Sequence, residues 1–268
     1  MKDGTFTLKT IDGDRAVVAY ASEAIQSFML SLPVRFDREG RLLYSDRNVI
    51  RAFQHGDSDV VVKRFKRNGL VKKVIYTFFR KTKARRAYFN GVELLRRGIS
   101  TPKPVAFMET YRHGLLRDCF YLCDVDNDTP IASAFDHDDW DRPLASAFGR
   151  FVALLQSRGV IDNDLNQTNV LFHGEEGNYH FSLIDINRMR FFPQGADIPL
   201  HDRLENLTRF TGRYDLFEYV VREFALACGL DADKTAEEGL KIKTAHDQNR
   251  RRRKQFTGFF KKLFRLSH

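Results

Sequence analysis

The spacing of the apolar residues changes along this chain of 268 residues, and the change limits the folds that the chain can adopt. In the first part, short apolar runs such as 59–65 are separated by turn signals, which is typical of antiparallel strands. Residues 81–97 are the exception, because their apolar positions recur at helical spacing before Gly98. Later, helical spacing dominates over 144–157 and 203–227. This order predicts an α+β fold with a small β-rich lobe that contains one helix, followed by a larger, mainly helical lobe.

An acidic segment, residues 124–141, separates the two parts and contains seven aspartates. We interpret it as the hinge and connector, which leaves residues 1–123 as the β-rich lobe and 142–249 as the helical lobe. The last nineteen residues, 250–268, carry eight positive charges and no acid, and they hold nearly the whole net charge of +9. We treat them as a separate basic tail.

The tail combines its charge with a regular apolar pattern. Residues 250–254 are all Arg or Lys, and the next ten place apolar side chains on one helical face, at 256, 259, 260, 263 and 264. A basic amphipathic helix of this kind can lie on an anionic membrane. Alternatively, the stripe packs on the helical lobe and closes its core. Because the apolar residues are mainly Phe, we expect a membrane surface and no nucleic acid as the partner of residues 250–268.

Other features bear on the compartment of the protein. No apolar run reaches the roughly eighteen residues of a membrane span, and the N-terminus lacks a basic segment leading into an apolar one. The three cysteines, Cys119, Cys123 and Cys228, are an odd number without metal-ligand spacing, which fits buried thiols in a reducing compartment. We therefore expect a cytoplasmic protein, peripheral at the inner face of the cytoplasmic membrane.

Three polar positions fall where an active site would need them. Lys63 follows three valines in a predicted strand, where an unpaired ammonium is costly to bury. A polar loop, residues 162–169, is enclosed by apolar segments, and Asp185 ends the apolar run 183–184. Taken singly, Lys63 is explained as a charge at a strand end that reaches solvent, and the loop is explained as an ordinary turn. Taken together, these positions match the groups that phosphoryl transfer requires.

Phosphoryl transfer depends on positioning and charge stabilisation, and each residue can supply one part. Lys63 can bind the α- and β-phosphates of ATP, and Asp164 can accept the proton of the acceptor hydroxyl. Asn169 and Asp185 offer the hard oxygen ligands that Mg²⁺ prefers. Strands predicted at 169–172 and 179–184 form a hairpin, and we expect it to return Asn169 and Asp185 to the same end, where one metal ion can reach both.

At these residues the sequence resembles the protein-kinase-like superfamily and, within it, the lipopolysaccharide kinase family (Kdo/heptose kinase type) of Gram-negative bacteria. Lys63 resembles the strand lysine, Asp164 with Asn169 the catalytic loop, and Asp185 the magnesium aspartate. The stretches 98–106 and 183–191 favour this family over ordinary protein kinases. The resemblance covers residues 40–225. It implies a bilobal protein-kinase-like fold that uses ATP and Mg²⁺ to phosphorylate a sugar hydroxyl of the lipopolysaccharide core or another lipid-linked saccharide.

The chain departs from the kinase pattern around the expected nucleotide site. No Gly-x-Gly-x-x-Gly precedes Lys63, and the corresponding turn lies near residues 45–48. Binding of the phosphates there would depend on backbone N–H groups and on Arg47 and Asn48. Ala87 stands where we expect the helix glutamate that pairs with the strand lysine, and Glu93 lies six residues further on.

A further departure lies in the catalytic loop, where Asp162 replaces the histidine that precedes the catalytic aspartate. Asp162 either repels Asp164 and raises its pKa, or caps the loop. Ile186 and Asn187 replace the Phe-Gly that follows the magnesium aspartate.

Two other functions fit the same residues. A protein Ser/Thr/Tyr kinase would use the same Asp, Asn and Asp, because these groups do not select the acceptor. A pseudokinase or membrane-associated scaffold without turnover is the alternative from another class, and the missing helix glutamate supports it.

Overall fold

A computed structural model describes residues 7–11, 14–19, 22–56, 58–66 and 69–265. The chain divides into two compact units. The first consists of Met1–Asp128 with Ser182–Arg188, and the second of Thr129–Phe181 with Met189–His268. Residues 182–188 therefore belong to the first unit, although they lie in the second half of the sequence.

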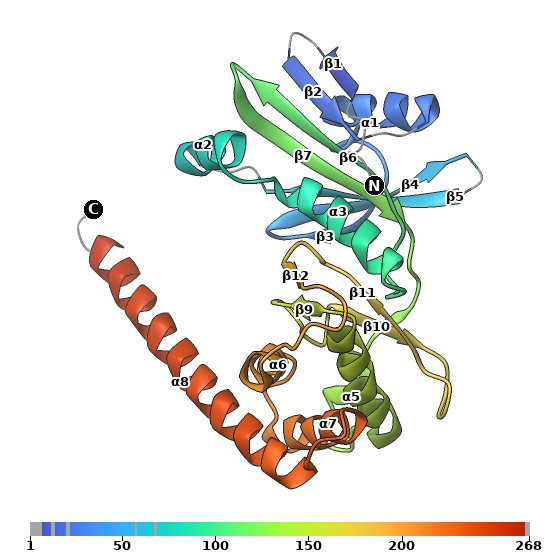
Figure 1. The fold of residues 1–268 in the computed structure, drawn as a ribbon. Helices are drawn as coiled ribbons and strands as arrows, with labels where there is room; N and C mark the ends of the chain where they lie inside the picture. The colour runs from blue at the N-terminus through green and yellow to red at the C-terminus, as the bar shows by residue number, and fades with distance from the viewer. Residues whose placement is uncertain (1–6, 12–13, 20–21, 57, 67–68, 266–268) are drawn as a thin grey trace. The chain divides into compact units, whose positions relative to one another are not determined.

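The first unit is built on a seven-stranded sheet in the order β1-β2-β6-β7-β5-β4-β3 (Figure 1). The paired strands are antiparallel, as the alternating apolar runs predict. Their bounds are β1 Thr7–Ile11, β2 Asp14–Val18, β3 Arg41–Ser45, β4 Asn48–His55, β5 Ser58–Phe65, β6 Pro104–Arg112 and β7 Leu115–Asp124. In this register Lys63 of β5 lies opposite Ile50 of β4 and Tyr121 of β7.

The two faces of the sheet follow from the alternation of side chains along each strand. Val60 and Val62 face a buried apolar cluster that includes Phe120 and Leu122 of β7. On the neighbouring positions of β7 and β6, Tyr121 and Phe107 are also buried. Because Lys63 follows Val62, it lies on the face opposite the cluster.

Helix α1 (Glu23–Arg35) packs on the clustered face, which corrects the prediction of a first part with a single helix. Its buried residues Phe28, Met29 and Leu32 recur at helical spacing, and the Ser22 side chain accepts a hydrogen bond from the N–H of Ile25. A second helix, α2 (Leu70–Phe78), was also not expected. It lies within the acid-free basic stretch 63–86, and its large apolar residues are exposed, so no buried stripe marks it.

Helix α3 (Lys83–Arg96) forms where helical spacing predicts it. Thr82 caps its N-terminus by accepting from the N–H of Arg85, and Gly98 follows its end with φ +68°. The helix contacts β5, β6 and β7. Gly91 allows close packing, because a Cβ there would lie 3.1 Å from both Ile186 and Pro104.

The second unit is mainly helical, as predicted. Its helices are α4 Ala132–Phe135, α5 Arg142–Ser157, α6 Leu200–Leu207, α7 Tyr214–Ala227 and α8 Ala232–Arg265. The strands β9 (Val160–Asp162) and β12 (Met189–Phe191) pair with each other, and β10 (Val170–His173) lies between β8 (Thr129–Pro130) and β11 (His180–Leu183). The expected hairpin is therefore present as β10 and β11.

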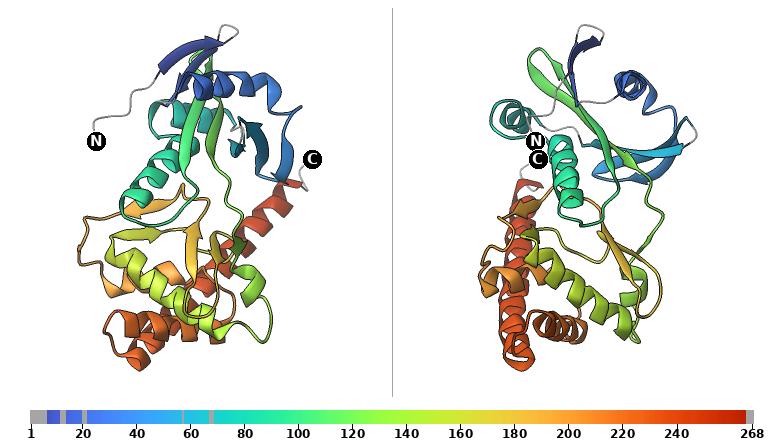
Figure 2. Two further views of the ribbon diagram at one scale, coloured as in Figure 1. Left: turned by 90° about the vertical axis from the view of Figure 1, so that its right-hand side faces the viewer. Right: turned by 45° about the vertical axis from the view of Figure 1, so that its right-hand side comes forward.

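The long helix α8 contacts α6 and α7 and includes most of the predicted basic tail (Figures 1 and 2). Its backbone is continuous across residue 250, where the sequence suggests a boundary. The side chains from Lys254 onward lie outside the described part of the structure, and so does the apolar stripe 256–264. Among the described residues, no helix combines the length and apolar character needed to cross a membrane.

Candidate active site

Lys63 and Asp185 form an ion pair within the first unit, although 122 positions separate them in the sequence. Lys63 Nζ lies 2.6 Å from Asp185 Oδ1, and the two side chains are 13% and 32% exposed. The partner of the strand lysine is therefore the expected magnesium aspartate. A half-buried pair of this kind keeps both charges next to solvent, where further ligands can reach them.

Asp185 has an unusual backbone conformation that a regular strand would not give it. Its φ is +53°, in the left-handed region that costs energy for residues other than glycine. Asn187 supports this turn, because its backbone N–H donates to Asp185 O at 2.9 Å and its Nδ2 donates to Asp185 Oδ1 at 2.6 Å. Non-glycine residues held in this way are concentrated at functional sites.

The segment around Asp185 is tied to the rest of the first unit by three hydrogen bonds. Leu183 donates its N–H to Ser100 O at 3.0 Å, and its carbonyl accepts from Thr101 Oγ1 at 2.7 Å. On the other side of Asp185, Asn90 Nδ2 of α3 donates to Ile186 O at 2.7 Å. Asp185 is thus fixed between the chain that follows Gly98 and the inner face of α3.

Helix α3 provides no carboxylate partner for Lys63 at Ala87 or Glu93. Ala87 is buried and has no charge to offer. Glu93 accepts hydrogen bonds from Arg96 and Arg97 at 2.6 to 2.7 Å, and the hydrogen bonds lower the pKa of Glu93 to about 2. Glu93 is therefore part of a local cluster at the end of the helix.

Cations that the sequence analysis did not single out lie at the start of α3 and three positions after Asp185. Lys83 begins α3, and burial lowers its pKa while the charge of Asp185 opposes that shift. Burial also lowers the pKa of Arg86, and its Nε is buried without a hydrogen-bond partner among the described residues. Arg188 interacts electrostatically with both. The signal for this group was the acid-free basic stretch at 63–86, which continues into α3.

Arg47 and Asn48 lie at the turn that joins β3 to β4, as predicted for the segment before Lys63. Asp46 donates its N–H to Asn48 O across this turn. Asn48 Oδ1 also accepts from the N–H of Lys66 at 3.3 Å, so this side chain joins β4 to the end of β5. Arg47 is exposed.

Asp164 and Asn169 are brought together within the second unit. Asn169 Nδ2 donates to the carbonyl of Asp164 at 3.0 Å, and Asn166 Nδ2 donates to the same carbonyl at 2.9 Å. The Asp164 side chain is 30% exposed, and its Oδ1 lies 3.4 Å from Arg209 Nη1. The loop therefore presents the Asp164 carboxylate to solvent while its own carbonyl is held by two amides.

Asp162 caps this loop, which is one of the two roles that the sequence analysis considers for it. Its side chain is buried, and its Oδ1 accepts from the N–H of Asp164 at 2.9 Å. Its carbonyl accepts from Asn206 Nδ2 at 2.5 Å and from the N–H of Leu165 at 3.2 Å. Asp162 thus fixes the backbone at Asp164.

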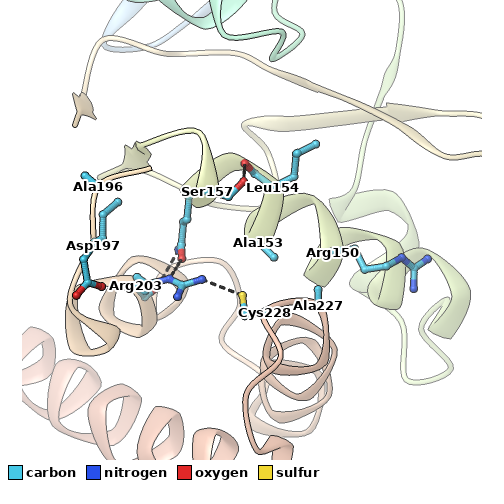
Figure 3. Close-up of a pocket in the computed structure, with 11 residues that line it drawn as sticks. Arg150, Ala153, Leu154, Ser157, Ala196, Asp197, Arg203, Ala227 and Cys228 are labelled. Carbon is cyan, nitrogen blue, oxygen red and sulfur yellow. Dashed lines mark hydrogen bonds between the residues drawn. The ribbon is translucent and has the colours of Figure 1, made fainter. Parts of the chain in front are cut away.

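A chain of hydrogen bonds connects the loop to a second region of this unit. Gln156 Nε2 donates to Asn206 Oδ1 at 3.2 Å, and Gln156 Oε1 accepts from Arg203 Nε at 2.9 Å. Arg203 also points toward Cys228, with Nη2 2.8 Å from Sγ (Figure 3). These residues border a cavity of about 450 Å³ between α5 and the chain around Ile198. The network positions Asp162 from behind the loop.

Asn169 in the second unit and Asp185 in the first each offer an oxygen of the kind that magnesium prefers. Asn169 uses its Nδ2 to bind Asp164 O, which leaves its Oδ1 as an oxygen ligand. The two donors to Asp185 both use Oδ1 among the described residues. No cluster of three or more His, Cys, Asp or Glu side chains occurs in the described ranges. Mg²⁺ commonly takes one or two protein ligands and completes its shell with phosphate and water.

Comparisons with known proteins agree on fold and family. Residues 39–215 match the lipopolysaccharide kinase (Kdo/WaaP) family. A solved structure of WaaP in complex with acyl carrier protein is 12% identical, with a TM-score of 0.58 over 87% of this chain and 97% of that one. The Rio2 kinase of Chaetomium thermophilum is 15% identical, with a TM-score of 0.43 over 91% and 83%. No curated protein sequence matches. The fold is protein-kinase-like, as predicted.

Proposed function

Because the chain belongs to the lipopolysaccharide kinase (Kdo/WaaP) family and is therefore a phosphotransferase, we propose that it transfers the γ-phosphate of ATP to a sugar hydroxyl of the lipopolysaccharide core. The observation that carries this proposal is the ion pair between Lys63 and Asp185, with Asp185 held at a positive φ. It supports activity despite Ala87, because Lys63 has a carboxylate partner without the helix glutamate.

In this proposal the first unit holds the nucleotide phosphates. Lys63 binds the α- and β-phosphates, and Lys83, which interacts electrostatically with Lys63 and Asp185, adds positive charge, as does Arg86 one turn further along α3. These cations compensate for the missing glycine-rich sequence, because phosphate binding requires donors and charge more than a particular loop. Arg47 and Asn48 contribute from the turn between β3 and β4.

Asn169 and Asp185 would hold Mg²⁺, which supplies charge neutralisation for the transferred phosphoryl group. Asp164 orients the acceptor hydroxyl and takes its proton as the oxygen attacks the γ-phosphorus. The bond from this phosphorus to the β–γ bridging oxygen breaks, and ADP leaves. Arg209 Nη1 lies 3.4 Å from Asp164 Oδ1 and adds positive charge beside this carboxylate. Asp162 and Asn206 are positioning residues, because they hold the backbone at Asp164 and do not touch the reacting atoms.

The acceptor is the part of this proposal that a direct assay tests. The protein is incubated with labelled ATP, Mg²⁺ and either deep-rough lipopolysaccharide or a generic protein substrate. We expect label in the lipopolysaccharide alone. Label in the protein substrate alone would contradict the proposed acceptor, and label in neither would contradict the enzymatic function.

We also propose that the protein works at an anionic membrane surface, the inner face of the cytoplasmic membrane, where a lipid-linked acceptor is presented. The basic tail supports this from the sequence. Helix α2 adds a second surface, because Phe78 and Phe79 are 67% and 78% exposed next to Arg80 and Lys81. Aromatic residues beside cations bind the interface of anionic membranes. Replacing both Phe residues with Ser should reduce sedimentation with phosphatidylglycerol vesicles, whereas unchanged sedimentation would contradict the role of α2.

A further inference from the structure

A large cavity lies beside the proposed catalytic residue, entirely within the second unit. Its walls are the catalytic loop with Asp164, helix α6, and the middle of helix α8. The volume is about 1130 Å³, above the roughly 300–1,000 Å³ of most small-molecule sites. Because the Asp164 carboxylate is part of the wall, a molecule in this cavity can bring a hydroxyl to the proposed proton acceptor.

The chemistry of the walls favours a polar occupant. Ile161, Ile242 and Ala245 are the apolar side chains among the lining residues. Most of the others carry amide, hydroxyl, imidazole or charged groups, such as Asn166 and Asn249. A wall of this composition hydrogen-bonds to the hydroxyl groups of a saccharide and gives little contact to an acyl chain.

The charges are arranged asymmetrically around the cavity. Asp202 and Glu205 lie on α6, whereas Arg250 and Arg253 lie on α8, and Arg190 and Arg209 complete the cationic side. Carboxylates such as those of α6 accept hydrogen bonds from sugar hydroxyls. Arginine forks bind phosphate and carboxylate groups by paired hydrogen bonds. The walls therefore suit a saccharide with an anionic substituent.

Helix α8 presents one face to this cavity. The lining positions Ile242, His246, Arg250 and Arg253 recur at intervals of three and four, as one face of a helix does. Arg251 and Arg252 are exposed and do not line the cavity.

One buried lysine fixes the wall that α8 forms. Lys243 is fully buried, and its Nζ donates to Thr211 O at 2.7 Å, to Thr208 O at 3.4 Å and to Asp247 Oδ2 at 3.2 Å. Thr208 follows the end of α6, so these bonds join α8 to that helix end and the following loop. The hydrogen bonds of Lys243 thus fix the part of α8 that precedes Arg250 and Arg253.

We propose that this cavity is the acceptor site and that it recognises an acidic saccharide, with Arg250 and Arg253 binding its phosphate or carboxylate group. The inference rests on the proposed function for the identity of the reaction, and it adds the site and chemical class of the acceptor. It gives Arg250 and Arg253, at the start of the basic tail, a role in substrate binding that is separate from the membrane role proposed for the rest of the tail.

The test compares two double variants of the full-length protein, Arg250→Ala/Arg253→Ala and Arg251→Ala/Arg252→Ala. Both remove two positive charges from the same turn of helix, but only the first pair lines the cavity. Fully deacylated deep-rough lipopolysaccharide is the probe, because it has no lipid and membrane affinity cannot contribute. Isothermal titration calorimetry measures its binding, and steady-state kinetics measure its KM.

We expect the first variant to weaken binding and raise the acceptor KM by about tenfold or more, with the KM for ATP unchanged. The second variant should stay within about twofold of the wild type. Equal losses in the two variants would show a general charge effect and overturn the inference, and so would unchanged binding in both.

Two modified probes identify the anionic group. A dephosphorylated saccharide retains its carboxylates, and a carboxyl-reduced saccharide retains its phosphates. The group that Arg250 and Arg253 bind is the one whose removal abolishes the difference between the two variants. If the difference survives both modifications, the acidic group is not what these arginines recognise, and the inference is wrong.

The proposed function and this inference fail in different ways. If the wild type transfers no phosphate but binds the saccharide, and the Arg250→Ala/Arg253→Ala variant binds it more weakly, the proposed function is contradicted and the acceptor site is supported. Phosphoryl transfer with equal acceptor affinity in both double variants would support the function and contradict the site.

Discussion

Asn206→Ala tests whether the network behind the catalytic loop positions Asp164. Asn206 is almost fully buried and contributes two hydrogen bonds, to the carbonyl of Asp162 at 2.5 Å and from Gln156 Nε2 at 3.2 Å. Each former partner retains one other bond, because Leu165 N–H still donates to Asp162 O and Gln156 Nε2 still donates to Arg203 O. The loss should therefore be that of two ordinary hydrogen bonds, about 2 kcal/mol.

The expected effect on stability is a melting temperature about 4–8 °C lower, given roughly 2–4 °C per kcal/mol for a protein of this size. The effect on turnover is separate. Asp162 sets the backbone of Asp164 through its side chain, and a misplacement of about 1 Å can cost roughly a hundredfold in rate. We expect kcat to fall about 10- to 100-fold below the melting transition, with the KM for ATP within about twofold.

Differential scanning fluorimetry and steady-state kinetics make the two measurements on the same preparation. Asn178→Ala is the matched control, because Asn178 is exposed in the turn before β11 and its backbone bond to Glu175 O does not need the side chain. It should change stability by less than about 0.5 kcal/mol and leave kcat unaltered. A fall in the melting temperature of Asn206→Ala with an unchanged kcat would refute the positioning role.

Lys63→Ala should reduce the thermal stabilisation by Mg-ATP while the ligand-free protein remains folded; an undiminished stabilisation would make Lys63 a plain surface charge. Glu93→Gln should lower the melting temperature near pH 7, and the gap to the wild type should close as the pH falls below about 4.5 toward 2, because the lowered pKa of Glu93 contributes stability only while the carboxylate is charged. A gap independent of pH would refute this. Gly149→Ala should cost about 1–3 kcal/mol in urea unfolding, since its Cβ would lie 2.9 Å from Val220 O, whereas Gly212→Ala meets nothing within 4 Å. Equal costs would contradict that packing.

The catalytic loop and the hairpin were predictable because their signals are local. The loop 162–169 is polar between apolar segments, and a Gly-containing turn joins the two short strands that follow. The contact between Lys63 and Asp185 depends on how the chain returns to the first unit after 122 positions, which no local pattern specifies. The sequence analysis left the partner of Lys63 open for this reason.

Helix α1 and the first half of α8 were not predicted from the sequence, for different reasons. Helix α1 had a usable signal, with Ser22 as its cap and apolar residues at helical spacing, but the short apolar runs at 16–20 and 41–44, broken by turn signals, directed the prediction to β structure. The first half of α8 had little apolar signal. Its buried positions include Thr235, Ala236 and Gly239, small residues that allow close packing against α7.

Phosphoryl transfer by the wild type and by Asp164→Ala, measured with labelled ATP, Mg²⁺ and deep-rough lipopolysaccharide, tests the central claim most directly. The variant should lose about 10²–10⁴-fold in turnover, as expected when a general base is removed. Its ATP affinity, measured in parallel by calorimetry, should be that of the wild type, because the carboxylate meets the acceptor hydroxyl and not the nucleotide. Wild-type turnover in Asp164→Ala would contradict the assignment of the catalytic residue and, with it, the proposed mechanism.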